Sequence, residues 1–116
     1  MRTIKELLNG NEKVWFYLGE DADLKKQFAT ELHDMGFTFL NGTEITADRM
    51  SRIISVHADG KIAHVSLMVW TVGFKPGDGS CGARHVFYHI PKIDYAKYVA
   101  GSSDYLMTEC NMTRIS

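Results

Sequence analysis

Hydrophobic positions alternate along the run "KVWFYLG" near the start of the chain. Aliphatic or phenyl side chains occupy every second position, and large aromatic side chains lie between them. The first set is Val14, Phe16 and Leu18, and the second is Trp15 and Tyr17. A period of two with this composition predicts a strand that has both faces occupied.

The next run, "DADLKKQFATELHDMG", changes to helical spacing. Its apolar residues form one stripe, made of Leu24, Phe28, Leu32 and Met35. Asp21 or Asp23 can cap the first turn, and Gly36 is a natural stop. The pattern predicts a helix that packs on a surface through one side. A shorter helix is predicted in "TIKELLNG", where Thr3 and Glu6 have capping-box spacing.

The strongest hairpin signal is "RIISVHADGKIAHVSLMVW". Asp59-Gly60 predicts a two-residue turn, in which both central positions have positive φ and Val56 faces Ala63. That register gives one aliphatic face: Ile54, Val56, Ala63, Val65, Leu67 and Val69. The opposite face then carries Ile53, Ser55, His57, Ile62, His64, Ser66, Met68 and Trp70. We expect the long helix to cover the aliphatic face and to leave the mixed face open.

The remaining elements are shorter. Residues 37–40 and the run "HVFYHI", which ends at Pro91, predict two further strands, and "DYAKYVAG" predicts a helix capped by Asp94. The tail 102–116 fits either an edge strand or a partly disordered segment. Residues 1–116 are thus expected to form a single α+β domain, with a mostly antiparallel sheet of four to six strands and one main helix packed on one face.

Composition narrows the classes of function. The chain has 116 residues, with 13 basic against 14 acidic residues, which argues against a general nucleic-acid footprint. Its longest apolar run is too short and too polar to span a bilayer. Only Cys81 and Cys110 are cysteines, and no apolar leader follows Met1, so we expect reduced thiols in a cytoplasm.

The glycine-rich stretch "WTVGFKPGDGSCGARHVFYHIP" resembles several kinds of site, none of them completely. Cys81, His85 and His89 can ligate a metal, but structural zinc usually takes four protein ligands. His57 and His64 could complete the ligand set only if the fifth strand lies beside the hairpin. "GFKPGDGS" lacks the Gly-Lys-Ser/Thr ending of a phosphate-binding loop. The context of Cys81 matches no thiol-enzyme signature. We therefore predict no catalytic residues, no metal and no cofactor.

A contact surface explains these residues better. The mixed sheet face and the loop 73–85 are predicted to meet a ligand or a second subunit. Cationic groups beside aromatic rings suit a phosphate-bearing small molecule or an acidic protein patch. The predicted binding residues are Lys75, Arg84, Trp70, His57, His64 and His85.

The progression of "GFTFLNG", "RIISVHADGKIAHVS" and "KIDYAKYVAGSSDY" resembles a loose group of small proteins carried by bacteriophages and mobile elements of Gram-positive bacteria. The similarity covers residues 14–72 and 90–105 as a pattern and leaves out the insert 73–85. Small phage proteins of this kind are often inhibitors of host defence. The resemblance implies a fold and carries no catalytic residues.

These observations favour a non-enzymatic binding protein of a phage or mobile element. It is expected to act in the bacterial host cytoplasm and to inhibit a host defence protein by protein–protein contacts, as anti-CRISPR inhibitors do. One alternative is a homo-oligomeric sponge that sequesters a phosphate-bearing nucleotide second messenger. The other is a small metal- or thiol-dependent hydrolase centred on Cys81, His85 and His89.

Overall fold

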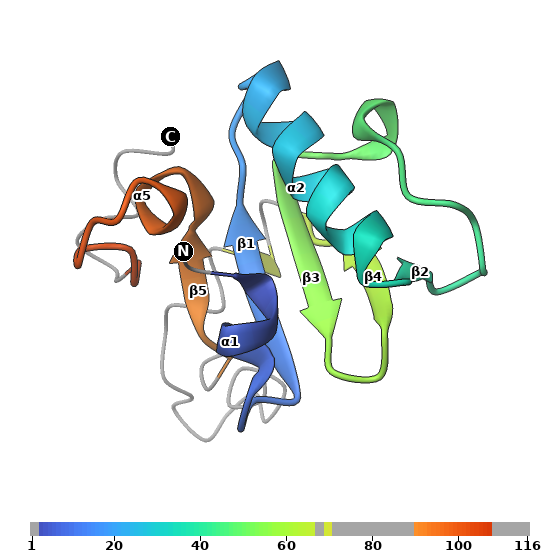
Figure 1. Ribbon diagram of the computed structural model, residues 1–116, viewed down its shortest axis with the longest axis horizontal. Helices are drawn as coiled ribbons and strands as arrows, with labels where there is room; N and C mark the ends of the chain where they lie inside the picture. Colours follow the sequence, from blue (N-terminus) through green and yellow to red (C-terminus); the bar gives the residue numbers. More distant parts are fainter. Residues whose placement is uncertain (1–2, 67–68, 71–89, 108–116) are drawn as a thin grey trace.

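The computed structural model describes residues 3–66, 69–70 and 90–107 as an α+β arrangement (Figure 1). In chain order the elements are α1 (Ile4–Leu8), β1 (Lys13–Tyr17), α2 (Ala22–Asp34), β2 (Thr38–Phe39), the 3-10 helix η1 (Ala47–Arg49), β3 (Ile53–His57), β4 (Lys61–His64), β5 (Lys92–Asp94) and α5 (Tyr95–Val99). The strands form one five-stranded sheet in the order β2-β4-β3-β1-β5.

The sheet is mixed, so the prediction of a mostly antiparallel sheet is wrong. β3 runs antiparallel to both β1 and β4, whereas β5 is parallel to β1 and β2 is parallel to β4. The hairpin reverses the chain between β3 and β4. β4 then runs in the same direction as its other neighbour, β2. β5 comes from a distant part of the sequence and joins the far side of β1.

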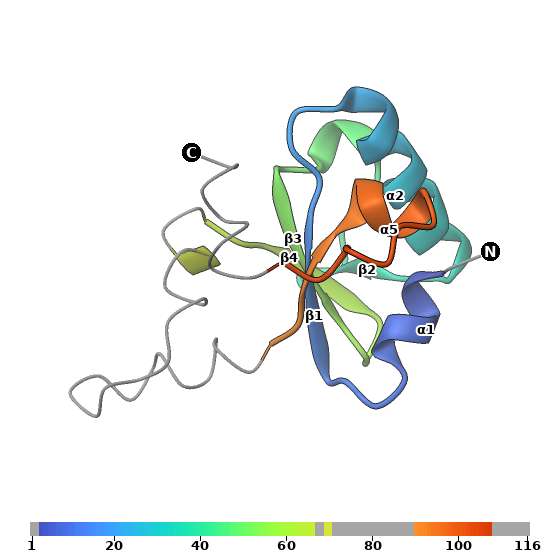
Figure 2. The same cartoon turned by 90° about the vertical axis from the view of Figure 1, so that its left-hand side faces the viewer.

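Among the described residues, the three α-helices cover one face of the sheet, where the sequence pattern predicted one main helix. α1, α2 and α5 lie together on the same side in Figure 2. α1 buries Ile4, and α5 buries Tyr95 and Tyr98, in the same core as α2. Both short helices were predicted from their caps, but their packing on the sheet was not, because their few apolar residues carry little periodic signal of their own.

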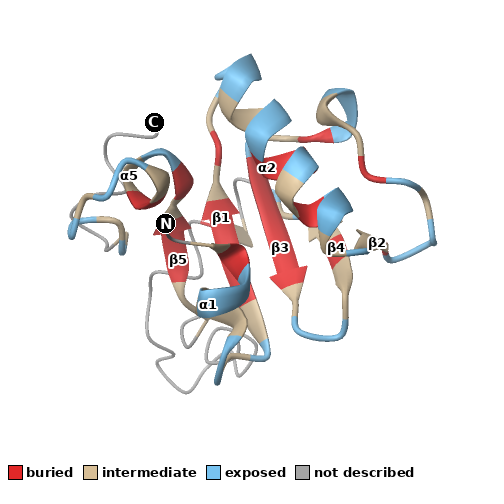
Figure 3. Cartoon of the chain, viewed as in Figure 1, coloured by how far each residue is buried: buried red, intermediate tan, exposed pale blue. Residues whose placement is uncertain are grey.

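The prediction for α2 is confirmed. The Asp21 side chain accepts a hydrogen bond from the Leu24 N–H at 3.1 Å, and Gly36 has a φ of 81° just beyond the helix. Phe28 and Leu32 are fully buried against the sheet. Figure 3 shows the result, with buried strands beneath a helix whose outer surface is exposed.

The hairpin forms, but its register differs by one residue from the prediction. Three residues, 58–60, connect β3 to β4, and only Gly60 has positive φ (93°). Its N–H donates to the His57 carbonyl at 3.1 Å. Val56 consequently pairs with Ile62, not Ala63. A three-residue loop with glycine at its end is a common hairpin connection, and the extra residue moves every β4 side chain to the opposite face.

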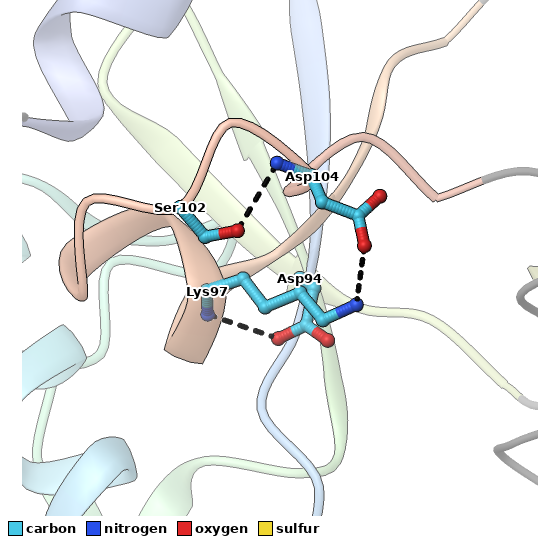
Figure 4. Close-up of polar contacts among 4 residues, drawn as sticks. All are labelled: Asp94, Lys97, Ser102 and Asp104. Carbon is cyan, nitrogen blue, oxygen red and sulfur yellow. Dashed lines mark hydrogen bonds and ion pairs between the residues drawn. The ribbon is translucent and has the colours of Figure 1, made fainter.

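Residues 94–107, the last part of the chain that the structure describes, are held by hydrogen bonds, an ion pair and a β-bridge. Asp94 caps α5 by accepting a hydrogen bond from the Lys97 N–H at 3.3 Å, as predicted. Lys97 Nζ reaches Asp104 at 3.1 Å, and the Asp104 N–H donates to Ser102 (Figure 4). Leu106 bridges Ile93 in antiparallel fashion. The predicted strand 85–90 falls almost entirely outside the described residues, as does the tail from 108 onward.

Candidate binding face

The face of the sheet opposite α1, α2 and α5, here called the helix-free face, has a small apolar cluster of its own. Trp15 of β1, Ile53 of β3 and Trp70 are its buried members. The Trp15 and Trp70 rings stack with centroids 6.2 Å apart, and Tyr17 lies 6.0 Å from Trp70. Trp70, a predicted binding residue, therefore packs inside this cluster.

A polar group borders the cluster on the same face. Lys13 pairs with His57 across β1 and β3, and His57 Nε2 lies 3.0 Å from Ser55 Oγ. Burial lowers the pKa of His57 from its ordinary value, and the nearby Lys13 ammonium lowers it further. The imidazole is accordingly held neutral near pH 7, where it can donate one hydrogen bond and accept another.

His64 does not share the face of His57, so the prediction that placed them together is wrong. In the observed register His64 pairs with Ile54, which belongs to the helix-side core. Its ring stacks on Phe39 at 5.3 Å, and its Nδ1 lies 2.9 Å from Ser51 Oγ. Ser51 Oγ donates its hydrogen to the Ile53 carbonyl. In the contact with His64, the Ser51 oxygen is therefore the acceptor and the Nδ1–H of the ring is the donor. The one-residue difference in the hairpin accounts for this placement.

An open hollow of ≈ 360 Å³ lies on the helix-free face. Trp15, Val65, Val69 and Ile90 contribute apolar lining. Among the described residues its polar lining is Lys13, Ser55, His57, His64 and Ser66; His64 reaches it from the end of β4. One ammonium, the His57 imidazole and two hydroxyls above an apolar base can hydrogen-bond a carboxylate or a phosphate group.

Lys92 is a residue that sequence reasoning missed. It pairs with Trp15 in the parallel register of β5 and β1, and it is only 5% exposed. Its Nζ donates to the Ile90 carbonyl at 2.6 Å and lies 5.2 Å from the centre of the Trp15 ring. Burial lowers the pKa of Lys92 to about 8. The only sequence signal for a strand here was the alternation of polar and apolar residues that begins with Lys92 and Ile93.

Replacing Lys92 with methionine is expected to remove a pH dependence of stability. Between about pH 8 and pH 10 the unfolded chain keeps the Lys92 proton that the folded protein has released, so the free energy of unfolding of the wild type rises with pH in that window. Lys92→Met should flatten this rise and stabilise the protein at pH 7 by roughly 1 kcal/mol. Urea unfolding at pH 7, 8.5 and 9.5 measures both effects.

The matched control is Lys26→Met, on the exposed surface of α2. It should leave the slope with pH as it is in the wild type. A wild-type stability that stays constant from pH 8 to pH 10 would show that Lys92 is not desolvated in the folded protein.

The other predicted binding residues, Lys75, Arg84 and His85, lie outside the described residues, as do Cys81 and His89. Within the described ranges, no three His, Cys, Asp or Glu side chains come close enough together to hold a metal ion. None of the helices in this part of the chain is long and apolar enough to cross a membrane.

Comparisons of the chain with protein-family models, curated proteins and solved structures found no match.

Proposed function

We propose that this chain is a non-enzymatic binding protein whose helix-free face contacts an acidic group on a protein partner. The observation that carries the proposal is the hollow beside Lys13, Ser55 and His57. Its polar groups supply donors, and the two tryptophans of the neighbouring cluster keep the surrounding surface rigid. Such a surface can recognise a partner without any chemical step.

The partner class follows from the resemblance to small proteins of phages and mobile elements. We infer a bacterial defence protein, met in the host cytoplasm and inhibited by occlusion of one of its surfaces. A hollow that carries the Lys13 ammonium is complementary to an exposed carboxylate on such a partner.

A nucleotide sponge remains the second candidate, because the same donors fit phosphate and because 360 Å³ suits a small ligand. The hydrolase alternative depends on Cys81, His85 and His89, and metal analysis of the purified protein addresses it directly.

Lys13→Glu is expected to weaken partner binding at least tenfold, because it replaces the ammonium at the hollow with a carboxylate that repels an acidic group. The experiment is a pull-down from bacterial host lysate, followed by affinity measurement on the captured protein. Lys26→Glu, the same change on the outer surface of α2, is the control and should bind as the wild type does.

Unfolding measurements on both variants separate lost binding from lost folding. Equal affinity of Lys13→Glu and wild type would contradict the proposal. Native mass spectrometry that finds a nucleotide bound to the wild type, and none on Lys13→Glu, would favour the sponge over the protein inhibitor.

A further inference from the structure

The outer edge of β4 is only partly covered by β2. The two strands pair at Lys61 and Ile62, and the last contact is the Leu40 N–H donating to the Ile62 carbonyl at 3.1 Å. The chain then turns away at Gly42, whose N–H donates to the Phe39 carbonyl at 2.8 Å. β4 continues to His64 without a paired strand on this side among the described residues.

The backbone pattern identifies the groups that face outward. The Val65 N–H donates to the Ile53 carbonyl of β3 at 3.2 Å, and Ala63 lies opposite Ser55. In an antiparallel ladder alternate residues bond to the same neighbour, so the N–H and C=O of His64 point away from β3. An edge of this kind is a template for another extended chain.

A hollow of ≈ 500 Å³ lies beside this edge. It borders the hollow near Lys13 at Ala63 and His64, and its other lining residues are different. Phe39, Leu40 and Ile62 form its apolar lining, and Arg49 and His64 border it. Leu40 is 60% exposed. The Arg49 guanidinium is also exposed, and no described carboxylate lies within ion-pair distance of it.

We propose that this edge accepts an extended segment of an acidic partner protein, which adds a strand beside β4. The His64 backbone groups bond the added strand. One large apolar side chain of the segment covers Leu40 and Phe39, and a carboxylate pairs with Arg49. Main-chain bonds give affinity in this mode, and alternate side chains give selectivity.

Charge decides between the occupants of the edge. A second copy of this chain would bring another Arg49 to the same place, where the two guanidinium charges repel. A segment that carries a carboxylate is complementary to Arg49. The proposed occupant is therefore an acidic, apolar strand from another protein.

The test uses a random heptapeptide display library selected against the full chain. Enriched peptides should combine a large apolar residue with an acidic one. In calorimetry with the best terminally blocked peptide, Arg49→Glu and Leu40→Asp should each weaken binding at least tenfold, whereas Lys26→Glu should not change it. The peptide should also slow hydrogen exchange at the His64 amide.

Both test positions are exposed, so the variants should fold, and their unfolding curves check this directly. Failure to enrich any peptide, or binding that ignores Arg49→Glu, would overturn the proposal. So would a dimer in light scattering that Leu40→Asp dissociates, because the edge would then be occupied by a second copy.

Discussion

Replacing Phe28 with alanine is expected to lower the free energy of unfolding by about 3–5 kcal/mol. Phe28 is fully buried between α2 and the sheet. Its ring lies 5.1 Å from that of Phe16 and 4.9 Å from that of Tyr95, and these two rings are 5.9 Å apart. Removal of the central ring leaves a cavity where α2, α5 and β1 meet, and the close-packed surroundings cannot close it fully.

Urea denaturation followed by circular dichroism measures the loss. Phe28→Leu keeps most of the volume and should cost about 1–2 kcal/mol. The control is Leu40→Ala, which removes an exposed apolar side chain and should change stability by less than about 0.5 kcal/mol. A loss of under 1 kcal/mol for Phe28→Ala would mean that these rings do not form the packed centre of the fold.

The second large effect is expected for Glu31→Ala, which should lower the free energy of unfolding by about 2–4 kcal/mol. One Glu31 oxygen accepts the Ile4 N–H at 2.5 Å, and the other accepts the Tyr95 hydroxyl at 2.8 Å. The side chain thus joins α1, α2 and α5. Its removal leaves two donors without their charged acceptor, one of them on a fully buried tyrosine.

Tyr95 retains its proton in the folded protein, because burial and the Glu31 carboxylate both raise its pKa far above the ordinary value. Its hydroxyl therefore remains a donor throughout the pH range of the measurement. Asp34→Ala, on the exposed surface of the same helix, is the matched control and should cost less than about 0.5 kcal/mol.

A double-mutant cycle with Tyr95→Phe tests the contact itself and should give a coupling energy of about 1 kcal/mol. Equal stabilities of Glu31→Ala and Asp34→Ala would contradict the bridging role of Glu31.

These two substitutions also clarify the functional experiments. Phe28 and Glu31 lie on the helix side of the sheet, whereas Lys13 and the hollow lie on the helix-free face. A variant of the first kind that remains folded should bind as the wild type does. Binding lost through Lys13→Glu at unchanged stability would then be a property of the surface.

Local rules predicted much of the fold correctly. The caps at Thr3, Asp21 and Asp94 and the glycine after α2 all occur as expected. Each depends on residues within three or four positions, where side chain and backbone geometry leave few choices. The apolar alternation of β1 is confirmed for the same reason, since a strand places every second side chain on one face.

The candidate site was predicted less well, and the hairpin explains why. Asp59-Gly60 correctly marks the reversal, but the sequence does not distinguish a two-residue from a three-residue connection there. The difference transfers Ile62 and His64 to the helix side and leaves His57 on the other face. The environment of Lys92 depends on Trp15, a residue far away in sequence, and no local pattern could identify it.

By itself, the sequence determined α1, α2, α5 and β1, because caps and periodicity act over one or two turns. It did not predict β5 (Lys92–Asp94) or the end of β4 at His64. Only the tertiary structure decided the mixed pairing of the sheet, the burial of Lys92 and the bridge from Glu31 to Ile4 and Tyr95. Those last contacts join residues 27 and 64 positions apart. Their energy comes from desolvation and from charged hydrogen bonds that exist only when distant segments meet.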